Sequence, residues 1–577
     1  MHTFRVWAPL PKQIAVEVNG VRQTMTAGPS GWWEATVADA KAGDDYGFIL
    51  DGEGPFPDPR SPSQPEGVHG SSRLIDHFSF GWTDQHWQAP PLSSAIFYEL
   101  HLGTFTPEGT FASACDKLDH LANLGVTHIE LMPVNEFSGH HGWGYDGVDL
   151  FAAHHSYGGV DELKKLIDAC HARGLAVFLD VVYNHLGPTG NYLGKFGPYF
   201  NPHYSTPWGS ALNFDGADNA EVRRFFCDNA LMWLRDYHFD GLRLDAVHAI
   251  IDASAEPFLE QLGREVKELS AATGRHLAVV AESDLNDPRV LDAREAGGFA
   301  LDAQWSDDFH HALHTVLTGE KNGYYADFGT FADLAKSFRH AWVYDGKYSS
   351  FRRRPHGRPH PGLSGHRFLG YMQNHDQIGN RAKGDRSGQF LSPGNLKIAS
   401  ALILTSPFVP MLFQGEEWAA TTPFIYFTDH PEPELAKAVR EGRQREFAAF
   451  GWKPEEIPDP QASETFARSK LNWSELGSPG CVEMLDWHKK LIRLRRSEPD
   501  LTNGNLEAVE VHFDESARWF VVKRGDIIVT CNFKNAIQEI PLPEGRKREV
   551  LMASSVVNFV ESGIALPPES VAVVKLT

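Results

Sequence analysis

The chain has 577 residues, of which 42% are hydrophobic and 12% aromatic, and its 53 basic and 75 acidic side chains give a formal net charge of −22. A chain of this length exceeds one hydrophobic core, so about two to four domains are expected. The negative charge disfavours phosphate backbones and anionic membranes as partners. We therefore expect no nucleic acid and no membrane partner, and a neutral, hydroxyl-rich ligand is compatible with the composition.

The cysteines and the apolar segments favour a cytoplasmic protein. The five cysteines are an odd number without a C-x-x-C pair, which argues against a disulfide framework or a zinc site. The first residues lack a basic region followed by an apolar run, so no signal peptide is expected. The longest apolar stretch, residues 398–413, contains Pro407 and Pro410 and is too short to span a bilayer. The sequence leaves a monomer and a homodimer open.

Residues 1–90 have the pattern of a small β-sandwich. Short apolar runs there are separated by Gly, Pro and Asp, a spacing typical of antiparallel strands. The predicted strands cover residues 3–6, 14–18, 31–37 and 46–50. Several prolines between Pro55 and Pro65, and then Pro90 and Pro91, form the connection to the next domain.

From residue 96 short apolar runs alternate with amphipathic helical stretches. Apolar residues recur at helical spacing over residues 160–170 and 222–237. Eight such alternations predict a (β/α)8 barrel over residues 91–500, closed by a helix that begins near Cys481. The predicted strands are residues 96–100, 127–132, 176–180, 241–245, 277–282, 300–305, 368–373 and 409–413.

The tail, residues 501–577, returns to a β pattern. Residues 518–523 and 526–533 flank a turn at Gly525, and residues 571–576 form a last predicted strand. The fold class is therefore α/β: a TIM barrel with an N-terminal β-sandwich and a C-terminal β-sandwich-like domain.

Four of the predicted barrel strands end in or lead to a carboxylate. These carboxylates are Asp180, Asp245, Glu282 and Asp376. Reactive groups of a (β/α)8 barrel project from the carboxyl ends of its strands. For one strand alone, a capping or solvent-facing carboxylate is the better explanation. Four in chain order favour a catalytic site.

The spacing of Arg243 and Asp245 gives these carboxylates distinct chemistry. Strand side chains alternate, so the two residues point to the same side, and the guanidinium lowers the pKa of Asp245. Glu282 follows the apolar run Leu-Ala-Val-Val-Ala, a setting that raises the pKa of its carboxyl group. One ionised and one protonated carboxyl group are typical of glycoside hydrolysis.

These four segments, in this order, resemble the four signature regions of the α-amylase superfamily, from Glu99 to about Glu417. The resemblance implies a retaining hydrolase with Asp245 as nucleophile, Glu282 as acid/base and Asp376 as transition-state stabiliser. It also implies a set of side chains that hold the sugar at the cleavage subsite. That set is Arg243, His185, His248, His375 and Tyr145. For Tyr145 considered alone, core packing and a ligand platform are equally good explanations.

Further stretches resemble one family within the superfamily. Residues 4–9 resemble the N-terminal sandwich of branching, debranching and trehalose-releasing members. Residues 302–311, 373–380, 441–452 and 469–473 resemble maltooligosyltrehalose trehalohydrolases, which cleave the α-1,4 bond next to a terminal trehalose unit. Maltooligosyl trehalose and related α-glucans are then the implied substrates. The resemblance adds Asp307, Asp308, Phe309, His310, His311, Gln377 and Asn380 to the substrate-binding residues.

Three alternative interpretations stay open. A glycogen-debranching or other α-glucan enzyme would share the sandwich, the barrel and the three carboxylates. A non-catalytic glucan-binding protein would share the scaffold but need not keep all three acids. Residues 441–452, without the resemblance, read as a charged surface helix.

No cofactor is expected from the sequence. Asn184 lies where many amylases place a calcium ligand. No cluster of oxygen ligands is visible around it, so we expect no required metal.

Overall fold

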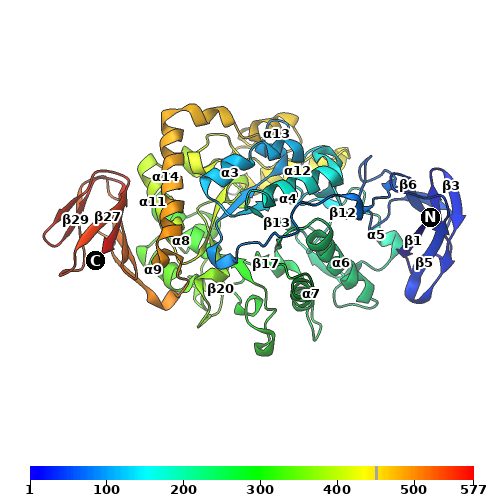
Figure 1. Ribbon diagram of the computed structural model, residues 1–577, viewed down its shortest axis with the longest axis horizontal. Coiled ribbons are helices and arrows are strands. Elements are labelled where there is room, and N and C mark those ends of the chain that lie inside the picture. Colours follow the sequence, from blue (N-terminus) through cyan, green and yellow to red (C-terminus); the bar gives the residue numbers. More distant parts are fainter. Residues whose placement is uncertain (449–451) are drawn as a thin grey trace.

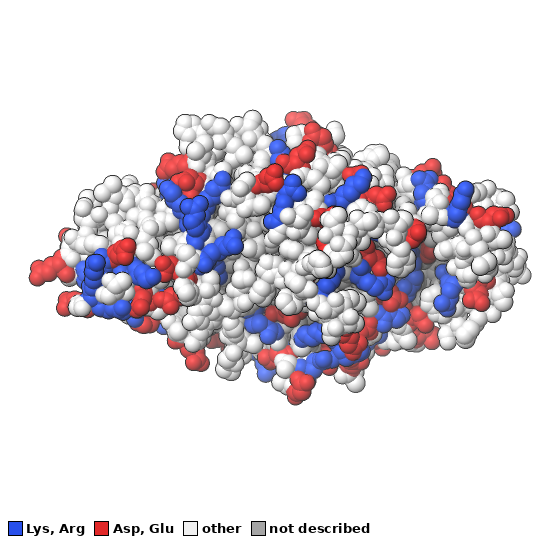
Figure 2. Space-filling view, viewed as in Figure 1, with Lys and Arg blue, Asp and Glu red and all other residues white. Residues whose placement is uncertain are grey.

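The computed structural model describes residues 1–448 and 452–577. The molecule is elongated, with the barrel in the middle and β-strands of the two terminal regions at opposite ends (Figure 1). Acidic and basic side chains are interspersed over the face shown in Figure 2. Within the described ranges no helix is both long and apolar enough to cross a bilayer.

The N-terminal region is built from two antiparallel sheets, as the turn-separated apolar runs predicted. One sheet has the order β1-β5-β4, and the other has the order β3-β2-β6-β7 with β8 paired to β6. Phe4, Val16 and Phe48 are at most 2% exposed and form part of the core. All four predicted strands are present. The strands are β1 (His2–Trp7), β2 (Ile14–Val18), β3 (Val21–Thr24), β4 (Thr26–Ala27), β5 (Trp32–Val37), β6 (Asp45–Leu50), β7 (Glu53–Phe56) and β8 (Ser72–Arg73).

The centre is a closed eight-stranded parallel barrel, which confirms the predicted fold class. Its order is β9-β10-β13-β16-β17-β18-β21-β22, with β22 pairing back to β9. Each strand falls within, or one residue from, a predicted apolar run. The strands are β9 (Phe97–Leu100), β10 (His128–Leu131), β13 (Ala176–Val181), β16 (Gly241–Leu244), β17 (Ala278–Ala281), β18 (Ala303–Trp305), β21 (Phe368–Gly370) and β22 (Val409–Phe413).

Helices cover the barrel with their apolar faces. In α4, for example, Val160, Leu163 and Ile167 recur at helical spacing and are buried. The three helical patterns expected from the sequence correspond to α4, α6 and α14. The helices of five or more residues are α2 (Phe111–Cys115), α3 (Leu118–Leu124), α4 (Gly159–His171), α6 (Ala220–Asp236), α7 (Phe258–Thr273), α8 (Asp307–Thr318), α9 (Phe331–His340), α10 (His375–Gly379), α11 (Pro393–Leu404), α12 (Pro433–Ala448), α13 (Ser463–Ser469) and α14 (Pro479–Ser497).

Three hairpins absent from the sequence prediction lie in the connections between barrel strands. They are β11–β12 (Asn135–Phe137, Gly147–Ala153), β14–β15 (Phe200–Thr206, Gly209–Leu212) and β19–β20 (Tyr348–Ser349, Arg354–Pro355). Segments that follow parallel barrel strands lie at the carboxyl face, where barrel enzymes carry their sites. The hairpins β11–β12 and β14–β15 follow β10 and β13 and therefore lie at this face. The hairpin β19–β20 follows α9, and its segment reaches the same face through the ion pair of Arg352 with Asp284, just after β17.

The C-terminal region also holds two sheets, with orders β23-β24-β25-β30-β27 and β26-β29-β28. The three predicted strands correspond to β24, β25 and β30. The side chain of Arg524 donates to the carbonyl groups of Thr405, Ser406 and Leu501, which ties β24 to the barrel. We propose domain boundaries near residues 90 and 500, where the strand groups change. The strands are β23 (Val509–Asp514), β24 (Trp519–Arg524), β25 (Ile527–Asn532), β26 (Gln538–Pro541), β27 (Arg548–Ala553), β28 (Asn558–Val560), β29 (Gly563–Leu566) and β30 (Ser570–Leu576).

Candidate active site

The guanidinium group of Arg243 binds carboxylates that come from three neighbouring strands. Its Nη1 donates to both oxygens of Asp180, at 2.8 and 2.7 Å, and to Oδ1 of Asp245 at 2.9 Å. Its Nη2 donates to Oε2 of Glu282 at 2.8 Å. Arg243 itself is fully buried. One side chain therefore fixes the relative positions of three of the predicted strand-end carboxylates.

Barrel register explains why these groups meet. Asp180 pairs with Arg243 across β13 and β16, and β16 pairs in turn with β17. The carboxyl ends of neighbouring parallel strands share one edge, so residues just past them converge. The Trp305 ring lies 4.2 Å from the guanidinium carbon and supports the cation from β18.

Asp245 is held in its ionised form. Burial alone would raise the pKa of its carboxyl group, but the charges of Arg243 and His185 and hydrogen bonds from Asn184 and Arg243 lower it below its usual value. The side-chain amide of Asn184 donates to the backbone oxygen and to Oδ2 of Asp245, at 2.9 and 2.6 Å. The side chain of Asp245 keeps 12% of its surface exposed. It is therefore an accessible anion with a fixed orientation.

Glu282 has the opposite electrostatic setting. Burial raises the pKa of its carboxyl group well above its usual value, and the charges of Asp245, Asp376 and Asp307 add to this effect although Arg243 opposes it. The backbone N–H of Ala246 donates to Oε2 at 2.8 Å. The Glu282 side chain keeps 17% exposure. The pKa values of the two carboxyl groups that Arg243 holds side by side are thus shifted in opposite directions, the directions expected from the sequence.

A second hydrogen-bonded chain reaches the site from β9. His375 Nδ1 lies 2.5 Å from Oε1 of Glu99, and its Nε2 lies 2.8 Å from the hydroxyl of Tyr145. That hydroxyl donates to Oδ2 of Asp180 at 2.6 Å. Burial lowers the pKa of His375, but Asp376 and Glu99 outweigh it and raise the value to about 9. His375 is therefore an imidazolium whose two N–H groups point to Glu99 and Tyr145.

Asp376 lies in the first turn of α10 and is the most exposed of the three proposed catalytic acids, at 34%. The Asn374 side chain caps this helix by accepting from the backbone N–H groups of Asp376 and Gln377. The Asn380 side chain donates to Oδ1 of Asp376 at 3.4 Å. The cap and the amide fix the carboxylate near His375, whose Nε2 is 3.5 Å away.

Asp307, Asp308 and His311 line a small hollow beyond β17 and β18, together with residues the sequence reasoning missed. Asp307 accepts from the hydroxyl of Tyr371 at 2.6 Å, and His311 stacks on Tyr324 with ring centroids 4.8 Å apart. The missed residues belong to loops without apolar periodicity, so no signal in the sequence marked them. They are Asp284, Asn286, Tyr324, Tyr344, Phe351 and Arg352.

His185 and His248 lie on the loops after β13 and β16. His185 contacts Oδ1 of Asn184 through Nδ1 and stacks on Trp208, with ring centroids 5.3 Å apart. Trp208 is 51% exposed at the turn of the β14–β15 hairpin, which the sequence did not predict. His248 Nδ1 lies 3.9 Å from Oδ1 of Asp284. Both histidines are thus at the carboxyl face of the barrel.

Phe309 was wrongly predicted to bind substrate. It is fully buried and packs against Phe338 and Phe408, with ring centroids 5.2 and 5.0 Å apart. Successive residues of α8 face different sides, so Phe309 points away from the side that carries Asp307. His310 is 1% exposed with its Nε2 bonded to the Tyr325 hydroxyl, so it too is covered.

Asp308 has a structural set of partners. Its Oδ2 accepts hydrogen bonds from the Asn286 side chain and from the backbone N–H groups of Val343 and Tyr344. The side chain is 5% exposed. These bonds hold Asn286 and Tyr344, which also line the hollow, in place.

Glu136, His154 and His155 bring a carboxylate and two imidazoles within 4.8 Å of one another, the spacing of a metal site. His155 Nδ1 already lies 2.8 Å from Oε1 of Glu136. His154 Nδ1 accepts from the backbone N–H of Ser156, so its proton is on Nε2 and that nitrogen offers no lone pair to a cation. These three residues therefore serve better as a hydrogen-bonded cluster at the base of the β11–β12 hairpin than as a metal centre. Asn184, likewise, donates its amide to Asp245.

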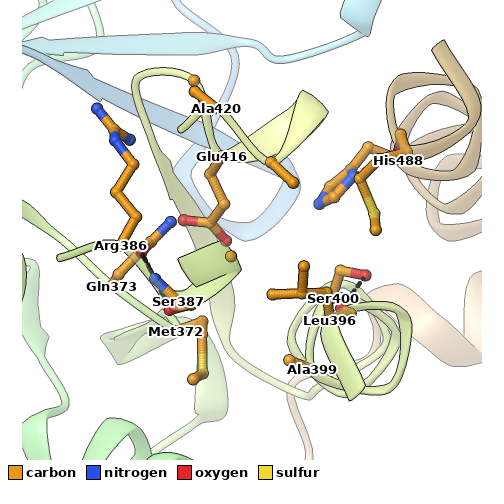
Figure 3. A pocket seen from close by; sticks show the side chains of 14 residues that line it. Met372, Gln373, Arg386, Ser387, Leu396, Ala399, Ser400, Glu416, Ala420 and His488 are labelled. Atoms are coloured by element: carbon orange, nitrogen blue, oxygen red, sulfur yellow. Dashed lines mark hydrogen bonds between the residues drawn. The ribbon is translucent and has the colours of Figure 1, made fainter. Parts of the chain in front are cut away.

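A cavity of about 20 Å³ lies behind the ends of β21 and β22 (Figure 3). Glu416, Arg386 and His488 line it, and burial raises the pKa of Glu416 to about 8. Its volume suits about one water molecule. A sugar ring is too large to enter this cavity.

Known proteins with the same organisation are similar over nearly the whole chain. The malto-oligosyltrehalose trehalohydrolase of Mycobacterium tuberculosis is 49% identical over 538 residues, covering 92% of each chain. That of Saccharolobus solfataricus is 43% identical over 540 residues, covering 93% of this chain and 92% of its own. The chain belongs to the malto-oligosyltrehalose trehalohydrolase family. The membership predicted from the sequence is confirmed, and with it that the protein is a glycoside hydrolase.

Other comparisons concern the fold and the alpha amylase catalytic domain. A crystal structure described as a putative alpha amylase from Salmonella typhimurium is 37% identical, has a TM-score of 0.90 and covers 99% of this chain and 97% of its own. A pullulanase from Anoxybacillus is 18% identical with a TM-score of 0.73, and the match covers 100% of this chain and 86% of the pullulanase. This match shows the fold alone. The family model for the alpha amylase catalytic domain matches residues 66–198, and a domain of unknown function (DUF3459) matches residues 504–573.

Proposed function

We propose that the protein hydrolyses the α-1,4-glucosidic bond next to the terminal trehalose unit of maltooligosyl trehalose and releases trehalose. The observation that carries this proposal is the pair Asp245 and Glu282, bound to one guanidinium group and shifted in opposite pKa directions. Family membership selects the substrate from among the α-glucans. We further propose a cytoplasmic location, which the five unpaired cysteines support.

In the first step the ionised Asp245 attacks the anomeric carbon of the glucosyl unit. An oxygen–carbon bond forms on Asp245 as the glucosidic bond breaks, and Glu282 gives its proton to the departing oxygen of trehalose. The charge that develops on the sugar is positive, so the nearby carboxylate of Asp376 stabilises it.

In the second step Glu282, now a carboxylate, takes a proton from water. That water attacks the anomeric carbon and displaces Asp245, which returns both carboxyl groups to their starting states. Arg243 keeps Asp245 and Glu282 in place through both steps. We propose that Tyr145, His185 and His375 border the reacting sugar.

Incubation with maltooligosyl trehalose and with unbranched maltooligosaccharides, followed by chromatography of the products, tests the function. We expect trehalose and a shortened maltooligosaccharide from the first substrate. Release of unbranched chains from an α-1,6-branched glucan, without trehalose release, would support the debranching alternative instead.

Net retention of anomeric configuration is the expected stereochemical result. A covalent intermediate on Asp245 inverts the anomeric carbon, and its hydrolysis inverts it again. The new reducing end should therefore appear first as the α-anomer in an NMR time course. An initial β-anomer would contradict the role given to Asp245.

The alkaline limb of the activity profile is expected to report Glu282. Activity needs its protonated form, so kcat/KM falls as pH rises through its raised pKa, while the lowered pKa of Asp245 keeps the acid side active. Burial raises the pKa of Asp307 to about 7; above that pH its charge raises the pKa of Glu282 further. Asp307→Asn should move the alkaline limb to lower pH, and an unmoved limb contradicts the coupling. The control Glu268→Gln, at a 64% exposed side chain, should leave it in place.

Exhaustive chelation is expected to leave activity unchanged. In the described part of the chain, Asn184 donates its amide to Asp245, His155 Nδ1 contacts Glu136, and His154 Nδ1 accepts from the backbone of Ser156. Activity before and after EDTA treatment and desalting measures this directly. Loss of activity that calcium restores would show a required ion.

A further inference from the structure

Helix α12 carries most of the family-like stretch 441–452, of which residues 449–451 lie outside the described residues. Its side chains divide sharply by exposure. Glu441, Arg445 and Glu446 are 48%, 73% and 47% exposed, as a charged surface helix requires. Arg443 is 15% exposed and faces the protein instead. This arginine is not explained by the surface-helix interpretation.

Arg443 contacts the C-terminal end of α10, the short helix that carries Asp376 in its first turn. Its Nη2 donates to the backbone oxygen of Gly379 at 2.7 Å, and its Nη1 donates to Oδ1 of Asn380 at 3.3 Å. Its guanidinium carbon lies 4.8 Å from the ring centroid of Tyr426 and 4.7 Å from that of Phe447. The two rings and an ion pair with Glu446 on the same helix hold the guanidinium in place.

The Asn380 amide connects this arginine to the proposed stabiliser. Its oxygen accepts from Arg443, so its NH2 group is the end that faces Oδ1 of Asp376, at 3.4 Å. An amide turned the other way would place its oxygen against that carboxylate and its NH2 group against a cation. Both contacts are repulsive, so Arg443 selects the orientation that donates to Asp376.

We propose that Arg443 is a positioning residue for the reaction: it fixes the Gly379 carbonyl and the Asn380 amide, and through that amide the direction of the Asp376 carboxylate. The proposal rests on the proposed function of Asp376. The proposal also assigns a role to α12 that its exposed charges do not explain, because Arg443 of this helix contacts the end of α10 that follows Asp376. Lysine cannot replace the arginine, since one ammonium group lacks the planar fork that reaches a carbonyl and an amide together.

The test compares Arg443→Met and Arg443→Lys with the matched control Arg445→Met on the same helix. A misplaced stabiliser acts on the transition state, so we expect kcat on maltooligosyl trehalose to fall by about 10²-fold for Arg443→Met with KM changed less than about threefold. Arg443→Lys should recover only part of this loss. Added guanidinium ion at non-denaturing concentration should raise kcat of Arg443→Met but not that of wild type. Arg445→Met should match wild type.

A double-mutant cycle with Asn380→Ala separates positioning from a general loss of stability. If Arg443 acts through Asn380, the fold-loss from Arg443→Met is smaller in the Asn380→Ala background than in wild type. The inference would be overturned if the fold-losses of kcat from the two single variants simply multiply in the double variant. It would also be overturned if Arg443→Met lowers both kcat and thermal stability and guanidinium ion does not restore kcat. Asp376→Asn is measured in parallel. If that variant keeps near-native kcat, the proposed function of Asp376 fails, and if it is inactive while Arg443→Met matches the control, only the inference fails.

Discussion

Asp245→Ala is expected to abolish hydrolysis while the protein remains folded. The variant removes the atom that forms the covalent intermediate, so no alternative route within the site replaces it. The fold survives because Arg243 keeps Asp180 and Glu282 as partners and is not left as an unpaired buried charge. Circular dichroism and thermal unfolding check the fold, and trehalose release measures the activity.

Glu282→Gln is the companion variant, and its loss should depend on the leaving group. An amide accepts from Arg243 and Ala246 as the carboxylate does, so the local geometry is retained. General-acid catalysis is worth about 10²–10⁴-fold, and kcat should fall by this amount on maltooligosyl trehalose. On an α-glucosyl fluoride, whose leaving group needs no proton, the loss in the first step should be far smaller. Near-native turnover of maltooligosyl trehalose by a folded variant at Asp245 or Glu282 would contradict the catalytic role given to that residue.

Maltotriosyl trehalose is expected to be cleaved much faster than maltopentaose of the same length. The bond broken is the same, so Asp245 and Glu282 cannot tell the substrates apart. The difference in rate must arise where the leaving unit binds. A site whose buried polar groups lose their hydrogen-bond partners with the wrong substrate discriminates against it by up to ~10⁴-fold in kcat/KM. The ratio of kcat/KM for the two substrates measures it.

Gln377 is the side chain through which we test this preference. Its Oε1 is buried and has no hydrogen-bond partner within the described residues, so this acceptor is unused in the protein alone. Gln377→Ala should narrow the ratio of kcat/KM without erasing catalysis. Asp308→Asn, at a carboxylate already bonded to Asn286 and two backbone N–H groups, should instead lower thermal stability. Equal cleavage of the two substrates by the wild-type protein would mark it as a general amylase.

The barrel was predictable because each of its strands is a compact apolar run. A strand buried on both faces has little room for polar residues, so Asp180 and Asp245 stand out where their runs end. The same signal says nothing about loops. Tyr324 and Arg352 reach the hollow beside Asp307 from segments whose path depends on tertiary packing, and the hairpin that carries Trp208 has no alternating pattern.

Helical residues were harder to assign than strand ends. The segment 307–311 was predicted as one substrate-binding block, although neighbours on a helix point in different directions. The structure places Asp307, Asp308 and His311 at the hollow and Phe309 in the core. Arg443 shows the reverse case, since its charge suggested solvent and its contacts with Gly379 and Asn380 are internal.

The three carboxylates on Arg243 make catalytic competence depend on contacts between residues far apart in the sequence. Asp180, Asp245 and Glu282 belong to three different strand ends, and they meet the guanidinium only when β13, β16 and β17 are paired in register. A chain in which these three strands are unpaired has the same residues but no site. During refolding, the recovery of trehalose-releasing activity therefore reports when these three strands have paired. It does so whatever the state of the sheets at either end of the molecule.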